Sequence, residues 1–329
     1  MHTGCPKRMV HGPCGCVRPD GRCEVAEHPC VFLDLVSPPP APTVAAVAPP
    51  VVPQVLTDLS VPPSDRATLT RTARRLAGST DALLVGDHQD RPDFSPSVLA
   101  RLIAEVGVPP WVTLACRERP RAALVAELDV LRDDGLATVV CVTGDGRRPE
   151  VDRATPSVFD LDGTRLTGLA AARGLSVAVP EAPAAPPLPL RPERLVRKQQ
   201  AGAAVAVLNH VGRPEAVAAF VMAARARGLT IPVVASVAVL TDERSAAALA
   251  ALPGLELDRA AVAAVLAAPD PVEAGIGAAV AAAVALLAVS GVAGVNLSGL
   301  ASGRGTAFAA EVQAEIGTRI REAVPAGRG

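Results

Sequence analysis

Four cysteines near the start of the chain have the residue type and spacing to bind a metal. Cys5, Cys14, Cys23 and Cys30 follow one another at intervals of 9, 9 and 7 residues, among glycines and prolines that permit tight turns. Four thiolates on such a loop suit zinc or an iron–sulfur cluster, and the spacing does not choose between them. Because so short a segment has little apolar core, the metal would supply its folding free energy. The alternative is a tail with incidental cysteines.

The cysteine count and the charge balance set limits on location and partners. The chain has seven cysteines and no apolar leader, which favours reduced thiols or metal ligands and predicts a cytoplasmic protein. It has 32 basic and 33 acidic residues, a net charge of -1 and no tyrosine, which argues against nucleic-acid partners. The uncharged run from Ala274 to Gly303 is rich in Ala and Gly, so we interpret it as a buried helix and a strand, not a membrane span.

After residue 50 the chain alternates short Val-rich runs with helical patterns. Eight strands buried on both faces, with helical crossovers, predict a (β/α)8 TIM barrel of the α/β class. The alternative is an open doubly wound sheet, but no GxGxxG motif follows the first expected strand of this chain. The predicted organisation is a cysteine-rich module (1–36), a Pro/Ala-rich linker (37–50) and a barrel (51–325). The expected strands are 51–59, 81–86, 111–116, 138–143, 175–180, 204–210, 231–237 and 292–299. The expected helices are 65–77, 95–106, 119–134, 163–173, 190–201, 213–227, 242–252, 273–289 and 306–323.

Barrel enzymes carry their chemistry at the carboxyl ends of the strands. Polar residues at the predicted strand ends are therefore the candidates for catalysis and binding. They are Asp58, Asp87, Cys116 to Arg119, Gly144, Asp145, Asn209, His210 and Asn296.

Two separate stretches resemble known sequences. The run CPKRM…GPCG…DGRCEV…C resembles the cysteine-rich domain called the methylenetetrahydrofolate reductase C-terminal domain, with Cys16 where GPCGG has its last glycine. The stretches WVTLACRERP…TVVCVTGDG, KQQAGAAVAVLNH and GVAGVNLSG are similar to the methylenetetrahydrofolate reductase barrel.

The resemblance implies a flavoprotein oxidoreductase of one-carbon metabolism and methionine biosynthesis. Such enzymes use FAD, which carries hydride from a nicotinamide or other donor to methylenetetrahydrofolate. Because family members often assemble, the resemblance also implies a homo-oligomer or a partner in a reductase complex.

The resemblance assigns catalytic roles to three residues. Gly144 and Asp145 keep the Gly-Asp pair that poises the flavin and contacts the folate. Asp58 is the carboxylate nearest to the position of the acid that delivers a proton, which is a Glu in the family. Asn209 stands where the family has a Gln. His210 beside it is either an acid–base group or a strand-end residue.

The flavin contacts carry over in part. Lys198 keeps the flavin-contacting Lys, Arg117 falls in a strand-end arginine cluster, and Thr113 stands where a His contacts the flavin. An acidic contact seven residues before the Lys falls on Arg191.

Two function classes follow from this combination of retained and substituted family residues. The first is a flavin-dependent reductase that converts 5,10-methylenetetrahydrofolate to 5-methyltetrahydrofolate. The second is a non-catalytic folate-binding or metal-binding partner of a reductase or methyltransferase complex. The altered flavin contacts also allow a barrel that uses another hydride carrier directly.

Overall fold

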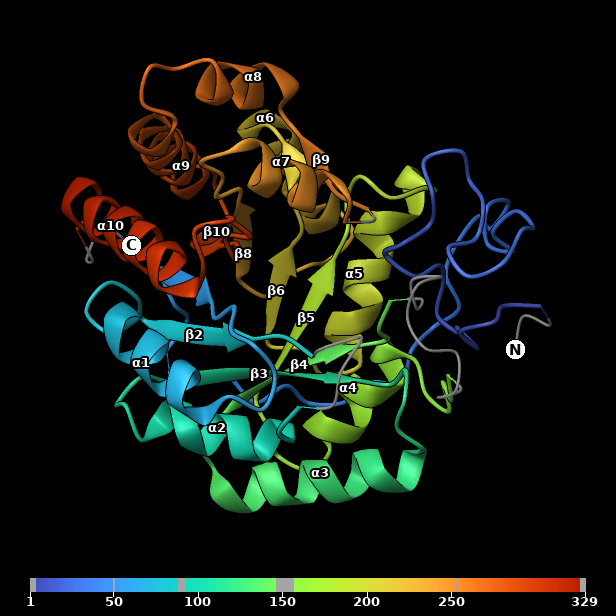
Figure 1. Cartoon of the computed structure of the whole chain (residues 1–329). Coiled ribbons are helices and arrows are strands. Elements are labelled where there is room, and N and C mark those ends of the chain that lie inside the picture. Colours follow the sequence, from blue (N-terminus) through green and yellow to red (C-terminus); the bar gives the residue numbers. More distant parts are fainter. Residues whose placement is uncertain (1–3, 50, 88–92, 146–156, 253, 326–329) are drawn as a thin grey trace.

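The computed structural model describes residues 4–49, 51–87, 93–145, 157–252 and 254–325. Within these ranges, eight parallel strands close into a barrel in the order β1, β10, β8, β6, β5, β4, β3 and β2 (Figure 1). The strands are β1 (Val55–Asp58), β2 (Ala82–Val85), β3 (Pro110–Ala115), β4 (Thr138–Val142), β5 (Val177–Glu181), β6 (Val205–Leu208), β8 (Val233–Val237) and β10 (Val292–Leu297).

Helices cover the outside of the barrel. They are α1 (Arg66–Leu76), α2 (Pro96–Ala104), α3 (Arg121–Asp134), α4 (Gly163–Ala171), α5 (Arg191–Gln200), α6 (Pro214–Arg225), α7 (Glu243–Ala250), α8 (Arg259–Leu266), α9 (Pro271–Leu287) and α10 (Thr306–Ala323). Strand residues alternate between two apolar layers. Val55 and Val112 face the helices, whereas their neighbours Leu56 and Trp111 fill the barrel interior.

The predicted (β/α)8 barrel is confirmed, with one helix and one small sheet that the sequence patterns did not indicate. Helix α8 begins after Asp258, whose carboxylate accepts hydrogen bonds from the amides of Ala260 and Ala261. Two-residue strands β7 (Val211–Gly212) and β9 (Glu256–Leu257) pair outside the barrel. Both strands are shorter than any alternation of apolar and polar residues that could reveal them.

The apolar segment from Ala274 to Gly303 folds as expected, as α9 followed by β10. Among the described residues, no helix has the length and apolar character needed to cross a membrane.

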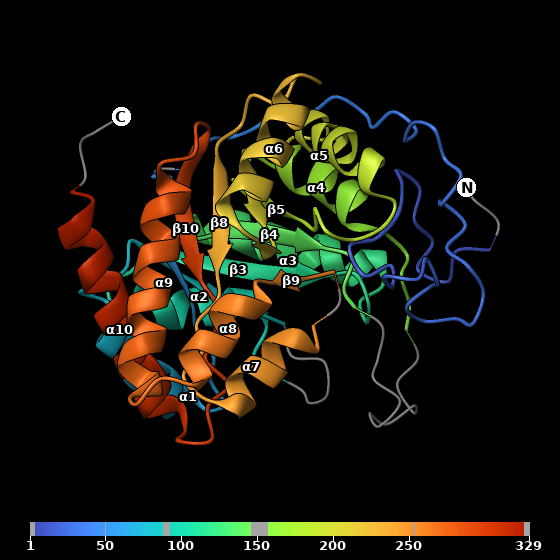
Figure 2. The ribbon, with the colours of Figure 1, turned by 90° about the horizontal axis from the view of Figure 1, so that it is seen from above.

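The N-terminal cysteine-rich segment packs on the carboxyl-terminal mouth of the barrel (Figures 1 and 2). The Lys7 ammonium donates to the carbonyl of Gly144 at 2.9 Å, and the Val10 amide donates to the Asp162 carboxylate at 2.8 Å. The residues after 36 then run beside α5, where the Val44 amide donates to the carbonyl of Gln200 at 2.8 Å. The predicted boundaries of module, linker and barrel stay a prediction, and residues 1–3 and 50 lie outside the described residues.

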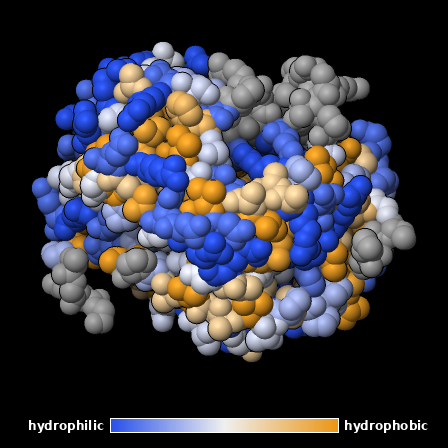
Figure 3. All heavy atoms as spheres, turned by 90° about the horizontal axis from the view of Figure 1, so that it is seen from below, coloured by the Kyte–Doolittle hydropathy of each residue, from blue (hydrophilic) through white to orange (hydrophobic). Residues whose placement is uncertain are grey.

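The face of the molecule shown in Figure 3 carries hydrophilic and hydrophobic residues in interleaved patches.

A glycine in β10 is required by the close approach of the preceding chain. A Cβ at Gly294 would lie 1.9 Å from the carbonyl oxygen of Pro53, so the backbone would have to shift. We expect Gly294→Ala to lower the free energy of unfolding by about 1–3 kcal/mol, measured by urea denaturation. The matched control is Gly277→Ala in α9, where a Cβ meets nothing within 4 Å; it should stabilise the protein by about 0.5–1 kcal/mol. Equal effects of the two substitutions would contradict this account.

Candidate functional site

A pocket of about 500 Å³ occupies the mouth of the barrel. Its walls come from the carboxyl ends of the barrel strands and from Cys14, Gly15 and Cys16 of the N-terminal segment. The cysteine-rich segment is therefore one wall of the pocket. The sequence-predicted residues that the pocket brings together are Asp58, Asp87, Thr113, Arg117, Gly144, Asp145, Lys198, Asn209, His210 and Asn296.

Asp58 lies at the end of β1 and is held by the neighbouring strand. Leu56 pairs with Asn296 of β10, which brings the Asn296 amide nitrogen within 3.0 Å of the Asp58 carboxylate. The amide of Gln313 on α10 donates to the backbone carbonyl of Asp58 at 3.0 Å. Burial raises the pKa of Asp58 to about 6, although the hydrogen bond from Asn296 works in the opposite direction. Asp58 is thus a carboxylic acid that holds its proton up to nearly neutral pH.

Asn209 and His210 follow β6 and line the same pocket. The backbone N–H of Asn209 donates to the backbone carbonyl of Glu181, which fixes the chain at Asn209 beside the end of β5. Burial lowers the pKa of His210 to about 4, so its imidazole is neutral at physiological pH. His210 therefore offers no proton as an imidazolium, and Asp58 is the better placed acid.

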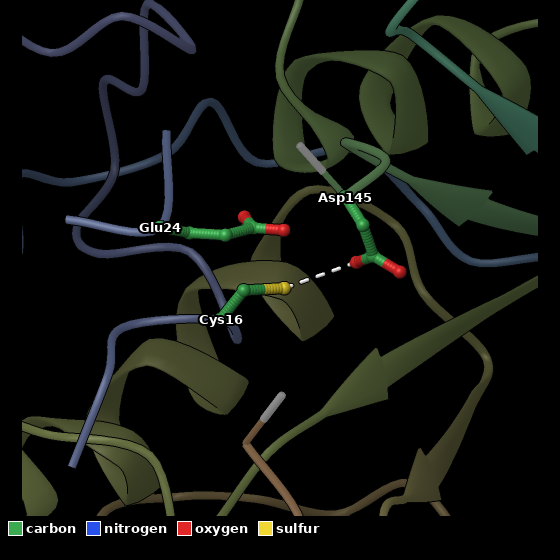
Figure 4. A group of neighbouring side chains, drawn as sticks. All are labelled: Cys16, Glu24 and Asp145. Carbon is green, nitrogen blue, oxygen red and sulfur yellow. Dashed lines mark hydrogen bonds between the residues drawn. The ribbon is translucent and has the colours of Figure 1, made fainter. Parts of the chain in front are cut away.

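Asp145 follows β4 and meets the cysteine-rich segment. The Cys16 thiol donates to the Asp145 carboxylate at 3.0 Å, and the Glu24 carboxylate points toward the same place (Figure 4). The ligand atoms of Cys16, Glu24 and Asp145 lie within 4.8 Å of one another, which would suit a metal ion. The buried ammonium of Lys7, however, already contacts the Glu24 carboxylate. The ammonium of Lys7 therefore already neutralises negative charge at the place where a metal ion would bind.

A buried carboxylate with three cations forms the wall beside Cys14. Glu181, at the end of β5, contacts Arg194 at 2.6 Å, Lys198 at 2.9 Å and Arg191 at 3.4 Å. Burial alone would raise the pKa of Glu181, but the three cations lower it to about 2. Burial and Arg194 lower the pKa of Lys198 to about 7. The carboxylate of Glu181 is thus the anionic partner that allows these three cationic side chains to be buried.

The positions that the resemblance assigns to the flavin have mixed environments. Thr113 and Arg117 line the pocket, and Arg117 is paired with Glu118 at 3.1 Å. The ammonium of Lys198 is bound to Glu181 and to the carbonyl of Pro180. Arg191 is fully buried and donates to the carbonyl of Cys14 at 2.9 Å. Lys198 and Arg191 therefore both serve internal contacts.

The four predicted metal-binding cysteines converge. Cys5, Cys14, Cys23 and Cys30 line one small cavity of about 20 Å³ next to the barrel pocket, and Cys14 lines both. Contact with the Cys16 thiol and the positive charge of Lys7 lower the pKa of Cys14, whereas burial raises that of Cys5 and Cys30.

The four thiols do not form a tight tetrahedron. In the part of the chain that the structure describes, the group Cys16, Glu24 and Asp145 is the only one whose ligand atoms all lie within 4.8 Å. Zinc bound at about 2.3 Å would hold its four sulfurs about 3.8 Å apart. In every set of three of these thiols, at least one pair of sulfurs therefore lies farther apart than 4.8 Å.

Glu181 and Cys16 are two of the site residues that sequence reasoning did not select. Glu181 directly follows the expected strand 175–180, so the strand-end rule could have found it. Cys16 was visible only as an extra cysteine, and its contact with Asp145 spans 129 residues.

Comparisons with known proteins agree with both resemblances. A family model described as methylenetetrahydrofolate reductase matches residues 68–307, and one described as methylene-tetrahydrofolate reductase C terminal matches residues 1–38. No curated protein matches the sequence.

Among solved structures, an uncharacterized protein from Clostridium thermocellum that binds two copies of 5-methyl-5,6,7,8-tetrahydrofolic acid has a TM-score of 0.52 at 12% identity. The match covers 79% of this chain and 93% of that one. Tryptophan synthase from M. tuberculosis, in an open form with BRD0059 bound, has a TM-score of 0.47 at 15% identity, over 85% and 94% of the two chains. The match to the Clostridium thermocellum protein supports a shared barrel fold and nothing finer.

The Glu181 cluster generates a stability prediction. Glu181→Gln removes the one anion among three cations, so we expect the free energy of unfolding to fall by about 3–5 kcal/mol in urea denaturation. Glu193→Gln is the matched control on the same side of the barrel, because Glu193 pairs with Arg197 at the surface, and it should cost less than about 1 kcal/mol. Similar denaturation midpoints for the two variants would refute a structural role for Glu181.

Proposed function

Because the chain belongs to the methylenetetrahydrofolate reductase family, we propose that its barrel binds 5,10-methylenetetrahydrofolate and reduces it to 5-methyltetrahydrofolate. The observation that carries the proposal is Asp58, an acid at the pocket end of β1 whose pKa burial raises to about 6. The Clostridium thermocellum barrel that binds 5-methyltetrahydrofolic acid supports a folate ligand. The alternative, a barrel that binds folate without reducing it, predicts binding with no turnover.

The chemistry requires a proton and a hydride. In methylenetetrahydrofolate one carbon bridges two nitrogens, so protonation of one nitrogen lets the bridge open to a cationic iminium. Asp58 is placed to give that proton, because an acid with a pKa near 6 is still partly protonated near neutral pH. The carboxylate of Asp145, three strands away around the barrel, can stabilise the cation that forms. Asn209 can hold the folate by hydrogen bonds.

The role of Asp58 predicts a pH profile. The acid must be protonated in the free enzyme, so kcat/KM should fall about tenfold per pH unit above pH 6. Asp58→Asn cannot donate the proton and should lower kcat by about 10²–10⁴ while the protein still binds the folate. Asp134→Asn, which alters a surface ion pair with Arg101, is the control and should match the wild type. Retained turnover in Asp58→Asn protein would remove Asp58 from proton delivery.

We further propose that Cys5, Cys14, Cys23 and Cys30 hold an iron–sulfur cluster rather than zinc. Thiolates suit either metal centre, but at least one sulfur pair in every set of three lies farther apart than 4.8 Å, which favours the larger cluster. A cluster would supply one-electron chemistry and folding free energy to a segment with little core.

The ligand assignment can be tested by metal analysis. Protein purified without air should contain iron and sulfide and absorb visible light, and Cys14→Ser or Cys23→Ser should remove most of both. Cys141→Ala, at a thiol buried among barrel residues, should leave the metal content unchanged. Zinc at one equivalent with no iron would refute the cluster, and full metal content in the serine variants would refute the ligands.

Other expectations from the sequence stay predictions. These are the cytoplasmic location, assembly as a homo-oligomer or with a reductase partner, and a part in methionine biosynthesis.

A further inference from the structure

Asn296 carries a buried amide whose one side-chain hydrogen bond among the described residues goes to the proposed acid, Asp58. Asn296 lies on β10 between Val295 and Leu297, which face the helices, so its own side chain points into the barrel. It is 4% exposed and lines the barrel pocket. Its Nδ2 donates to the Asp58 carboxylate at 3.0 Å, whereas its Oδ1 is buried and has no hydrogen-bond partner in the described part of the chain.

Packing does not explain an amide at this position. A buried acceptor without a donor costs folding free energy, and most buried polar groups in proteins avoid that cost. The barrel interior is otherwise filled by apolar side chains such as Leu56 and Val234. A leucine at position 296 would have nearly the shape of asparagine and no unpartnered oxygen. What the amide adds is its hydrogen bond to Asp58.

The strand ends around this hydrogen bond are fixed to each other. The Nε2 of Gln313 on α10 donates to the backbone carbonyls of Asp58 and Ser298, at 3.0 Å each, and so joins the end of β1 to the end of β10. The backbone N–H of Gly299, just beyond β10, donates to the Asp58 carboxyl. The acid is therefore held from the β10 side by one side chain, Asn296, and one backbone group.

Few charges surround the acid. β1 packs against β2, β10 and α10, and the two strands carry no charged residue. The residue of α10 that contacts Asp58 is the uncharged Gln313. After β2, Asp87 is ion-paired with Arg119 at 2.8 Å, and His210 on the pocket wall is neutral. Burial, which raises the pKa of Asp58, and the hydrogen bonds from β10 and the residues after it, which lower that pKa, are therefore the dominant influences on this carboxyl.

We infer that Asn296 is a positioning residue for proton delivery, whose amide nitrogen holds the Asp58 carboxyl in the pocket and whose presence costs the protein stability. The inference rests on the proposed folate reduction. Asn296 itself moves no proton. The proton passes from Asp58 to the folate nitrogen as the bond from that nitrogen to the bridging carbon breaks, and the amide then stabilises the carboxylate that remains.

The first test needs no turnover. Asn296→Leu removes the unpartnered oxygen and the donor together, and urea denaturation is measured at about pH 5 and about pH 8. At the lower pH Asp58 keeps its proton, so the variant should be at least as stable as the wild type. At the higher pH the ionised carboxyl lacks its donor, so the variant should be less stable than the wild type.

The sign follows from the pKa of Asp58. Its value of about 6 in the folded protein lies above the value of about 4 for an unfolded chain. Ionisation of Asp58 therefore lowers the stability of the folded protein as the pH rises through 6. The hydrogen bond from Asn296 reduces that loss, so its removal should steepen the fall in stability.

Two controls make the comparison specific to Asp58. In Asp58→Asn protein the carboxyl is absent, so adding Asn296→Leu should change the stability by the same amount at both pH values. Val295→Ala, at the neighbouring core position of β10, should lower the urea midpoint equally at both. An equal loss of stability at both pH values in Asn296→Leu would mark Asn296 as a structural residue and overturn the inference.

The second test is the pH dependence of turnover. Without the donor the pKa of Asp58 rises, so the fall of kcat/KM in Asn296→Leu should begin about one to two pH units higher than in the wild type. The less well oriented acid should also lower kcat by about tenfold below that pH. Asn296→Asp is a second variant of nearly the same shape. Its carboxyl beside Asp58 disfavours a second negative charge and should move the same limb upward.

The kinetic outcomes separate this inference from the proposed function. Wild-type protein that reduces methylenetetrahydrofolate, with the pH limb unmoved in both variants, would keep the proposed function and overturn the role of Asn296. Wild-type protein that neither binds 5-methyltetrahydrofolate in calorimetry nor reduces methylenetetrahydrofolate would overturn the proposed function and this inference together.

Discussion

The buried carboxylate of Glu181 is the interaction on which the site depends. It ends β5 and holds three cations, all of which belong to α5, and one of them, Arg191, also donates to the backbone carbonyl of Cys14. A buried charge is tolerated only when its partners are in place. The cluster therefore fixes the position of α5 against β5, and through Arg191 it fixes the cysteine-rich segment against the barrel mouth.

The contact between Cys16 and Asp145 joins the cysteine-rich segment to the end of β4 in the barrel pocket. Asp145 is the carboxylate that we propose stabilises a cation, and it accepts a hydrogen bond from the thiol of Cys16, 129 residues earlier in the chain. Lys7 reaches the adjacent Gly144 carbonyl and the Glu24 carboxylate. The cysteine-rich segment therefore shapes the pocket through these contacts.

Most of the fold could be predicted from sequence, because buried parallel strands are short Val-rich runs with clear helical patterns between them. Helix α8 and the β7–β9 pair lacked such a signal. The positions of Asp58 and Asn209 at the pocket followed from the strand-end rule. The contacts of Lys198 and Arg191 could not be predicted, because both depend on Glu181, and Arg191 also on the packing of residues 12–15. A motif fixes which residue stands at a position, while tertiary packing decides whether its charge is free to meet a ligand.

The contacts of Lys7 and Cys14 also bear on synthesis. Their partners Gly144 and Arg191 lie 137 and 177 residues later in the chain. At about 5–20 residues per second, the ribosome needs roughly ten to thirty seconds to deliver those partners. During that interval the nascent thiols have no barrel mouth to shelter them. The N-terminal segment is therefore made before the residues on which it docks, and it cannot reach its native contacts until those residues have been synthesised.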